Sequence, residues 1–161
     1  MSGIRTAVVR FYLDADVLGL ARLICQERSD CTYPGDPGIV IRKRRREPCP
    51  VTSPGAKDPD WIPVVARLGW LIITRDRHIN ERLGELQVVR DHGAKIVNLA
   101  GTDAGTIWKQ LEIVVTRWRE IELLADEAGP FICSLSRTGR IQPIDLDKAI
   151  AAAARRRGIA Q

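Results

Sequence analysis

The stretch VVRFYLDAD, residues 8–16, decides the fold. Its first six residues are rich in β-branched and aromatic side chains, which favour a β-strand. The apolar run ends at Asp14, and apolar residues then recur at helical spacing between residues 17 and 24. A strand that leads directly into a helix is the start of a βαβ unit. The stretch therefore predicts an α/β protein with acidic residues at the end of its first strand.

Strand and helix patterns alternate further along the chain. Residues 70–74 are almost wholly apolar, which is typical of a central strand buried on both faces. Pro59 suits the first turn of a preceding helix, because proline there loses no needed hydrogen bond. The pattern then predicts a helix over 80–92, a strand over 95–99 and a long amphipathic helix over 104–125. This alternation predicts a mostly parallel central sheet flanked by helices.

The middle and the end of the chain have different patterns. Residues 34–57 mix proline, glycine and like charges, so they predict a basic surface loop with freedom to move, in which only 38–41 hint at regular structure. Residues 129–161 predict a C-terminal β-hairpin, turning at Thr138-Gly139, and a terminal helix over 147–157. At 161 residues, the chain is expected to form a single domain, 1–161, with one core.

Composition indicates the compartment and the class of partner. The net charge is +5, with basic runs at 42–46 and 155–157, and this favours a nucleic acid over a membrane as partner. No stretch has the length and hydropathy of a membrane span or a secretory signal, so a cytoplasmic protein is expected. The four cysteines are scattered without a histidine cluster, which predicts free thiols and no zinc site.

Acidic residues follow the predicted strands at the edge where open α/β sheets bind ligands. Asp14 and Asp16 follow the first strand, and Asp76 follows the 70–74 strand. Asp58 and Asp60 begin the helix that leads into that second strand. An isolated aspartate after a strand is more often a helix cap than a ligand, but here several segments deliver acids to one edge.

Such a cluster of like charges is costly unless a cation neutralises it. Carboxylate oxygens are the ligands that Mg²⁺ and Mn²⁺ prefer, so the convergence predicts one of these cofactors. Positions two apart on a helix differ in direction by about 200°, so either Asp58 or Asp60 is expected to face the ion.

Three segments resemble the PIN domains, and most closely the PIN-like toxins of the VapC type from bacterial toxin–antitoxin pairs. Phe11-Tyr12-Leu13-Asp14-Ala15-Asp16 looks like the opening strand with its first metal-binding aspartate. Residues 58–76 look like the acidic helix, the connecting glycine and the strand that ends in Thr-Arg-Asp. Gly129-Pro130-Phe131-Ile132, with Gly139-Arg140-Ile141, is similar to the C-terminal region of one subgroup.

The resemblance implies a single PIN-like domain that acts as a metal-dependent endoribonuclease on single-stranded or loop regions of RNA. It implies inhibition by a small antitoxin and, because members commonly dimerise, a homodimer as one expected assembly. Asp14 and Asp76 are the first metal ligands expected, Asp58 or Asp60 completes the acidic set, and Asp16 is a direct or water-mediated neighbour.

Other residues take supporting roles in this interpretation. The Thr74 hydroxyl is placed to orient a carboxylate or a water molecule. Arg75, Arg77, Arg44 and Arg45 are candidate RNA contacts, since guanidinium groups pair with phosphates, and a solvated basic face is the equal alternative. The chain departs from the family in one respect: where an acid on a helix is usual after the first βα unit, it offers only Asp36 and Glu47.

Two other functions fit the same residues. The D-x-D of Asp14 and Asp16 resembles the first motif of haloacid-dehalogenase-type phosphatases, in which the first aspartate is the nucleophile. Leu18 argues against this interpretation, because that family expects threonine or valine there. The other alternative is a catalytically degenerate PIN-like module that binds RNA or an antitoxin without cutting.

Overall fold

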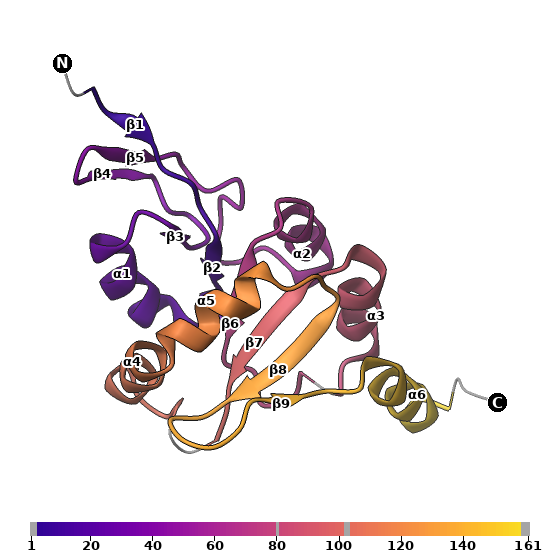
Figure 1. The fold of residues 1–161 in the computed structure, drawn as a ribbon. Helices are drawn as coiled ribbons and strands as arrows, with labels where there is room; N and C mark the ends of the chain where they lie inside the picture. Colours follow the sequence, from indigo (N-terminus) through magenta and orange to yellow (C-terminus); the bar gives the residue numbers. More distant parts are fainter. Residues whose placement is uncertain (1–2, 80, 102–103, 159–161) are drawn as a thin grey trace.

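A six-stranded sheet forms the centre of the molecule, with strand order β3-β2-β6-β7-β8-β9 (Figure 1). The computed structural model describes residues 3–79, 81–101 and 104–158. Every pair of neighbours is parallel except β8 and β9, so the prediction of a mostly parallel α/β sheet with a C-terminal hairpin is confirmed. The strands are β2 (Phe11–Leu13), β3 (Cys31–Thr32), β6 (Leu71–Thr74), β7 (Lys95–Leu99), β8 (Phe131–Leu135) and β9 (Gln142–Pro143).

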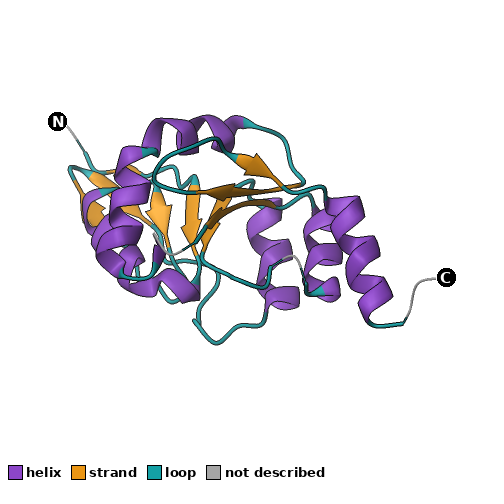
Figure 2. Cartoon of the chain, turned by 90° about the horizontal axis from the view of Figure 1, so that it is seen from below, coloured by secondary structure: helices purple, strands orange, loops and turns teal. Residues whose placement is uncertain are grey.

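Helices cover both faces of this sheet (Figure 2). Side chains alternate between the faces, so Phe11 and Leu13 pack with one set of helices while Tyr12 packs with the other. Burial on both faces explains why β2 and β6 are continuous apolar runs. The first set is α1 (Leu18–Glu27), α4 (Ile107–Thr116) and α5 (Trp118–Asp126), and the second is α2 (Asp58–Arg67), α3 (Leu83–His92) and α6 (Leu146–Arg156).

Two strands of a second, three-stranded sheet lie in the region 34–57, where the sequence predicts a loop with a hint of regular structure at 38–41. Strands β4 (Ile39–Ile41) and β5 (Arg44–Arg46) form an antiparallel hairpin, and β5 also pairs in parallel with β1 (Arg5–Thr6). The hairpin is anchored by the buried Arg46, whose guanidinium binds Asp36 with an Nε–Oδ2 distance of 2.6 Å. The basic run is therefore part of a hairpin: residues 42–43 form its turn and residues 44–46 form strand β5.

Two helix boundaries also differ from the predicted ones. The helix expected over 104–125 is divided at Arg117, whose guanidinium binds Ser136 O and the carboxylate of Glu120. The helix expected over 80–92 begins at Leu83, and Asn80 lies outside the described residues. A short 3₁₀ turn, η1 (Ala15–Val17), joins β2 to α1. Within the described chain, no helix has the length and hydropathy to cross a membrane.

Candidate active site

The candidate site lies at the carboxyl ends of β2 and β6, where the connections of the sheet diverge. The chain passes from β2 through α1 to β3 on one side, whereas β6 pairs with the other side of β2. In open α/β sheets, ligands bind in the crevice at such a switch point. Asp14 directly follows β2 and Asp76 lies two residues beyond β6, so both acids reach this crevice.

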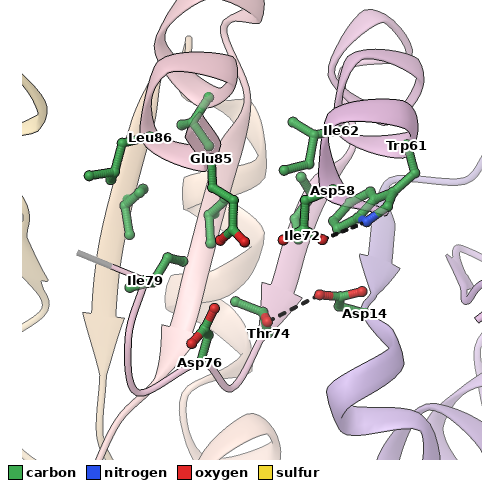
Figure 3. Close-up of a pocket in the computed structure, with 13 residues that line it drawn as sticks. Asp14, Asp58, Trp61, Ile62, Ile72, Thr74, Asp76, Ile79, Glu85 and Leu86 are labelled. Atoms are coloured by element: carbon green, nitrogen blue, oxygen red, sulfur yellow. Dashed lines mark hydrogen bonds between the residues drawn. The ribbon is translucent and has the colours of Figure 1, made fainter. Parts of the chain in front are cut away.

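Four carboxylates from four different elements line one pocket there (Figure 3). Asp14 and Asp76 come from the strand ends, Asp58 from the first turn of α2 and Glu85 from the first turn of α3. The floor of the pocket is apolar and is formed by Ile62, Ile72, Ile79, Leu86, Val89, Ile96 and Ile132. Acids above an apolar floor are poorly hydrated, so their charged forms are disfavoured.

Asp14 is held by two donors from its surroundings. Its Oδ1 accepts a 2.6 Å hydrogen bond from the backbone N–H of Ala15, and its Oδ2 lies 3.4 Å from the Thr74 hydroxyl. Burial raises the pKa of Asp14 to about 7, and the negative charges of Asp16 and Asp58 add to the shift. The folded protein thus holds a carboxyl group that readily gains a proton near neutral pH.

Asp58 and Glu85 form the opposite wall of the pocket, and their carboxyl groups face each other in Figure 3. Asp58 Oδ1 accepts a 2.8 Å hydrogen bond from Trp61 Nε1, and the Trp61 ring stacks on Tyr12 of β2. Burial, a hydrogen bond to Asp58 and the charge of Asp58 together raise the pKa of Glu85 to about 7. The two carboxyl groups therefore lie on the same side of one pocket and interact electrostatically.

Asp76 is fixed from two directions. The buried Asn98 of β7 clamps its backbone, because Asn98 Oδ1 accepts from Asp76 N and Asn98 Nδ2 donates to Asp76 O, both at 2.9 Å. Arg82 Nη1 lies 3.0 Å from Asp76 Oδ2 and 3.1 Å from Glu85 Oε1. One guanidinium thus bridges two of the four acids and partly balances their charge.

Asp16 lies beside the pocket rather than in its lining. Its Oδ2 accepts hydrogen bonds from the Thr74 hydroxyl at 2.7 Å and from the backbone N–H of Arg75 at 3.2 Å. Thr74 is buried and contacts both Asp14 and Asp16 through its hydroxyl. Thr74 therefore has the geometry of the orienting residue that the sequence predicts.

Some predicted site residues are not brought to the pocket. Asp60 is exposed on α2 and takes no part in the lining, so of the two helix acids it is Asp58 that faces the site. Arg75 is half-buried and Arg77 is exposed; they flank Asp76 in sequence without lining the pocket. Arg44 and Arg45 belong to β5 in the second sheet.

Glu85 is not among the site residues that the sequence predicts, although the usual helix acid of PIN-like domains has no counterpart in the expected region. Asp36, one of the two residues considered there, is buried in its ion pair with Arg46, and Glu47 is exposed. Glu85 fills the gap in the acidic set from a different helix. The position of Glu85 in the first turn of the helix after β6 could have indicated its role, because that turn lies near the carboxyl edge of the sheet.

The chemistry of the four acids fits a hard divalent cation, which prefers carboxylate oxygens. Burial is the largest cause of the raised pKa values at Asp14 and Glu85, and neighbouring carboxylates add to both shifts, so a bound cation would relieve unfavourable negative charge in the pocket. Within residues 3–79, 81–101 and 104–158, no three Cys, His, Asp or Glu side chains are already arranged as a metal site. Asp58 is bound to Trp61 and Asp76 to Arg82, so ligation by these acids requires side-chain movement.

Comparison with protein families agrees with this geometry. Residues 37–101 match the model of a PIN-like domain. The matched segment contains three of the four pocket acids, Asp58, Asp76 and Glu85, and ends before α4. The PIN-like match and the α/β fold are compatible with nuclease activity in general, and neither of them indicates a toxin. Neither the curated proteins nor the solved structures gave a match.

Proposed function

We propose that this protein is an endoribonuclease that uses Mg²⁺ or Mn²⁺ held by the carboxylates of the pocket. The observation that carries the proposal is the convergence of Asp14, Asp58, Asp76 and Glu85 from four elements on one crevice. The PIN-like match over residues 37–101 supports the same class of reaction. The basic net charge of +5 suits a polyanionic substrate.

Different side chains of the pocket take different roles in phosphodiester hydrolysis. A bound divalent ion supplies charge neutralisation at the phosphate and a more acidic water. Asp14 and Asp76 are the ligands assigned first, with Asp58 and Glu85 completing the set and Thr74 orienting Asp14. Glu85, whose pKa is raised to about 7 mainly by burial, can accept or release a proton near neutral pH, which hydrolysis requires.

The phosphatase alternative is less well supported by the geometry. It needs Asp14 and Asp16 to act together on a substrate, whereas Asp16 lies outside the pocket lining and is bound by Thr74 and the backbone of Arg75. It also needs a lysine, and no lysine is among the residues that line the pocket. The acids from α2 and α3 have no role in that mechanism but are used in the nuclease proposal.

Incubation of the purified protein with end-labelled RNA and Mg²⁺ or Mn²⁺ tests the proposal. We expect cleavage that EDTA stops and that Asp76→Asn reduces about a hundredfold or more, because metal-assisted charge stabilisation is worth several kcal/mol. Asp60→Asn is the matched control, since it removes an equivalent charge from the same edge outside the pocket, and it should cleave like the unaltered protein. Cleavage that survives Asp76→Asn would refute the assignment, and RNA binding without cleavage would support the binding-only module.

We further propose, on the resemblance to VapC-type toxins, that the protein is the toxin of a toxin–antitoxin pair with a small antitoxin as partner. Overproduction in a bacterial host is then expected to arrest growth, because uncontrolled RNA cleavage stops translation. Growth curves should show the arrest with the unaltered protein and none with Asp76→Asn at equal protein level. Arrest by both forms would show that toxicity does not come from this site.

A further inference from the structure

The second sheet presents an unusual concentration of positive charge. We call it the basic sheet and define it as β1, β4, β5 and the turn at Arg42 and Lys43. Residues 39–46 read IVIRKRRR, with no acid among them. All of its basic residues except Arg46 are exposed: Arg5, Arg42, Lys43, Arg44 and Arg45.

The strand register places these charges side by side. Arg5 and Arg44 are direct partners in the parallel ladder between β1 and β5, and neighbouring strands lie about 4.8 Å apart. Like charges directly opposite each other destabilise a sheet. Within the described residues, Arg5, Arg44 and Arg45 have no hydrogen-bonding or ion-pair partner for their side chains. Glu27 pairs with Arg42, and Glu27 and Asp30 line the same pocket as Arg44, so acids of the protein balance the positive charge of the basic sheet only in part.

The basic sheet and the acidic pocket lie at opposite ends of β2. β1 leads into β2 through residues 7–10, and Asp14 follows the far end of the strand. Figure 1 shows the basic sheet extending beyond the start of β2, beside α1. The 3 residues of β2 alone separate its two ends by about 10 Å, and an extended chain from Arg5 to Asp14 reaches at most about 30 Å. Charges separated by more than about 8 Å are largely screened. The arginines therefore do not serve to balance the pocket acids.

We propose that the basic sheet is a second RNA-binding surface, which holds the phosphates of a substrate strand whose cleaved region lies in the acidic pocket. This inference rests on the proposed function. Guanidinium groups pair bidentately with phosphate, and a run of cations without interspersed acids matches a uniform polyanion. An acidic protein is the rival occupant, because Ile39 and Val40 on the hairpin and Ile4 and Val8 beside β1 are exposed apolar side chains of the kind that protein interfaces bury. The uninterrupted run of basic residues favours a phosphate polyanion, and the comparison with polyglutamate tests the rival.

The distance between the two surfaces sets the length of RNA that can use both. A stacked strand advances about 3.4 Å per nucleotide, so roughly nine nucleotides span 30 Å. A long RNA of about 20 nucleotides should contact both surfaces, whereas an RNA of about four nucleotides should reach the pocket alone. The contribution of the basic sheet is thus expected to depend on substrate length.

The test compares two double variants of the full chain with equal loss of charge. Arg44→Ala/Arg45→Ala removes exposed charge from β5, and Arg155→Ala/Arg157→Ala removes it from the end of α6. Fluorescence anisotropy in EDTA measures binding without cleavage. We expect the β5 variant to bind the long RNA about tenfold more weakly. The slope of the logarithm of its association constant against the logarithm of the salt concentration should be shallower by about 1.4. The α6 variant should bind like the unaltered protein.

Cleavage of the short RNA with Mn²⁺ separates the two proposals. The β5 variant should cleave the short RNA at the same rate as the unaltered protein. If the unaltered protein does not cleave this RNA, the proposed nuclease function is overturned. The anisotropy measurement still tests RNA binding by the basic sheet in that case. Equal affinity of both variants for the long RNA overturns the second binding surface. A tenfold loss that is the same for labelled polyglutamate also overturns it, because the sheet would then be a general anion-binding surface. Thermal unfolding checks that both variants are folded.

Discussion

Replacement of Asp14 by asparagine is expected to reduce RNA cleavage about a hundredfold or more and, at the same time, to stabilise the metal-free protein. The first effect follows from the loss of an oxygen ligand for a divalent ion, whose charge stabilisation is worth several kcal/mol. The second follows because Asp14 lies against Asp16 and Asp58 above an apolar floor, where its negative charge is unfavourable. Opposite signs for activity and stability are typical of functional sites.

The gain in stability should depend on pH in a defined direction. The pKa of Asp14 rises from 3.8 to about 7 in the folded protein, so the folded state binds the proton more tightly than the unfolded state. The contribution of Asp14 to the free energy of unfolding is therefore fully present below about pH 4 and is lost as the pH rises towards 7. Urea unfolding in EDTA should show Asp14→Asn to be more stable by about 1–2 kcal/mol at pH 8, a value reduced because the side chain is partly exposed.

Asp60→Asn serves as the control in the same measurement, because Asp60 is exposed and lies outside the pocket lining. It should change neither cleavage nor the urea midpoint at any pH. If Asp14→Asn proved less stable than the unaltered protein at pH 8, burial and neighbouring charge would not make the Asp14 carboxylate unfavourable in the folded state.

Replacement of Arg46 by methionine is expected to lower the free energy of unfolding by about 3–5 kcal/mol, because it leaves the carboxylate of Asp36 buried without its counter-ion. Only 2% of the Arg46 side chain and 1% of the Asp36 side chain are exposed, so water cannot replace the lost partner. Arg46 Nη1 also donates to Cys25 O and Arg28 O near the end of α1, at 3.0 Å each. Equilibrium urea unfolding at pH 7 measures the loss.

Two further variants show whether the ion pair is the cause. Arg45→Met removes an exposed charge from the neighbouring position and should change stability by less than about 0.5 kcal/mol. The double variant Asp36→Leu/Arg46→Met removes both charges and should be more stable than Arg46→Met alone. A double variant that is less stable than the single one would assign the effect to lost packing instead.

The sequence predicted those parts of the fold that depend on local patterns. The apolar run of β6 and the alternation of strand and helix around it depend on side chains near one another in the chain, and β7 was predicted with the bounds that the structure has. Strands β1 and β5 were missed because a basic run has no apolar alternation to indicate a strand. Their formation depends on pairing with each other and on the contact between Arg46 and Asp36.

The same distinction applies to the acidic pocket. Asp14 and Asp76 were predicted to lie near each other because the carboxyl ends of parallel strands meet at one edge, and β2 and β6 are direct neighbours. The sequence does not show whether Asp58 or Asp60 faces the pocket, because the direction of each side chain depends on the exact residue at which α2 begins. Glu85 was missed because its position depends on α3 starting at Leu83 rather than at residue 80.

The pairing of β2 with β6 has a consequence for biosynthesis. Phe11 and Leu71 are partners in that ladder, and Glu85 lies further along the chain. A nascent chain that ends before β6 therefore lacks the strand that neighbours Asp14, and one that ends before α3 still lacks the fourth acid. Because such a non-local contact closes only after the intervening chain is available, the pocket cannot assemble on the ribosome before the whole segment from β2 to α3 has been synthesised.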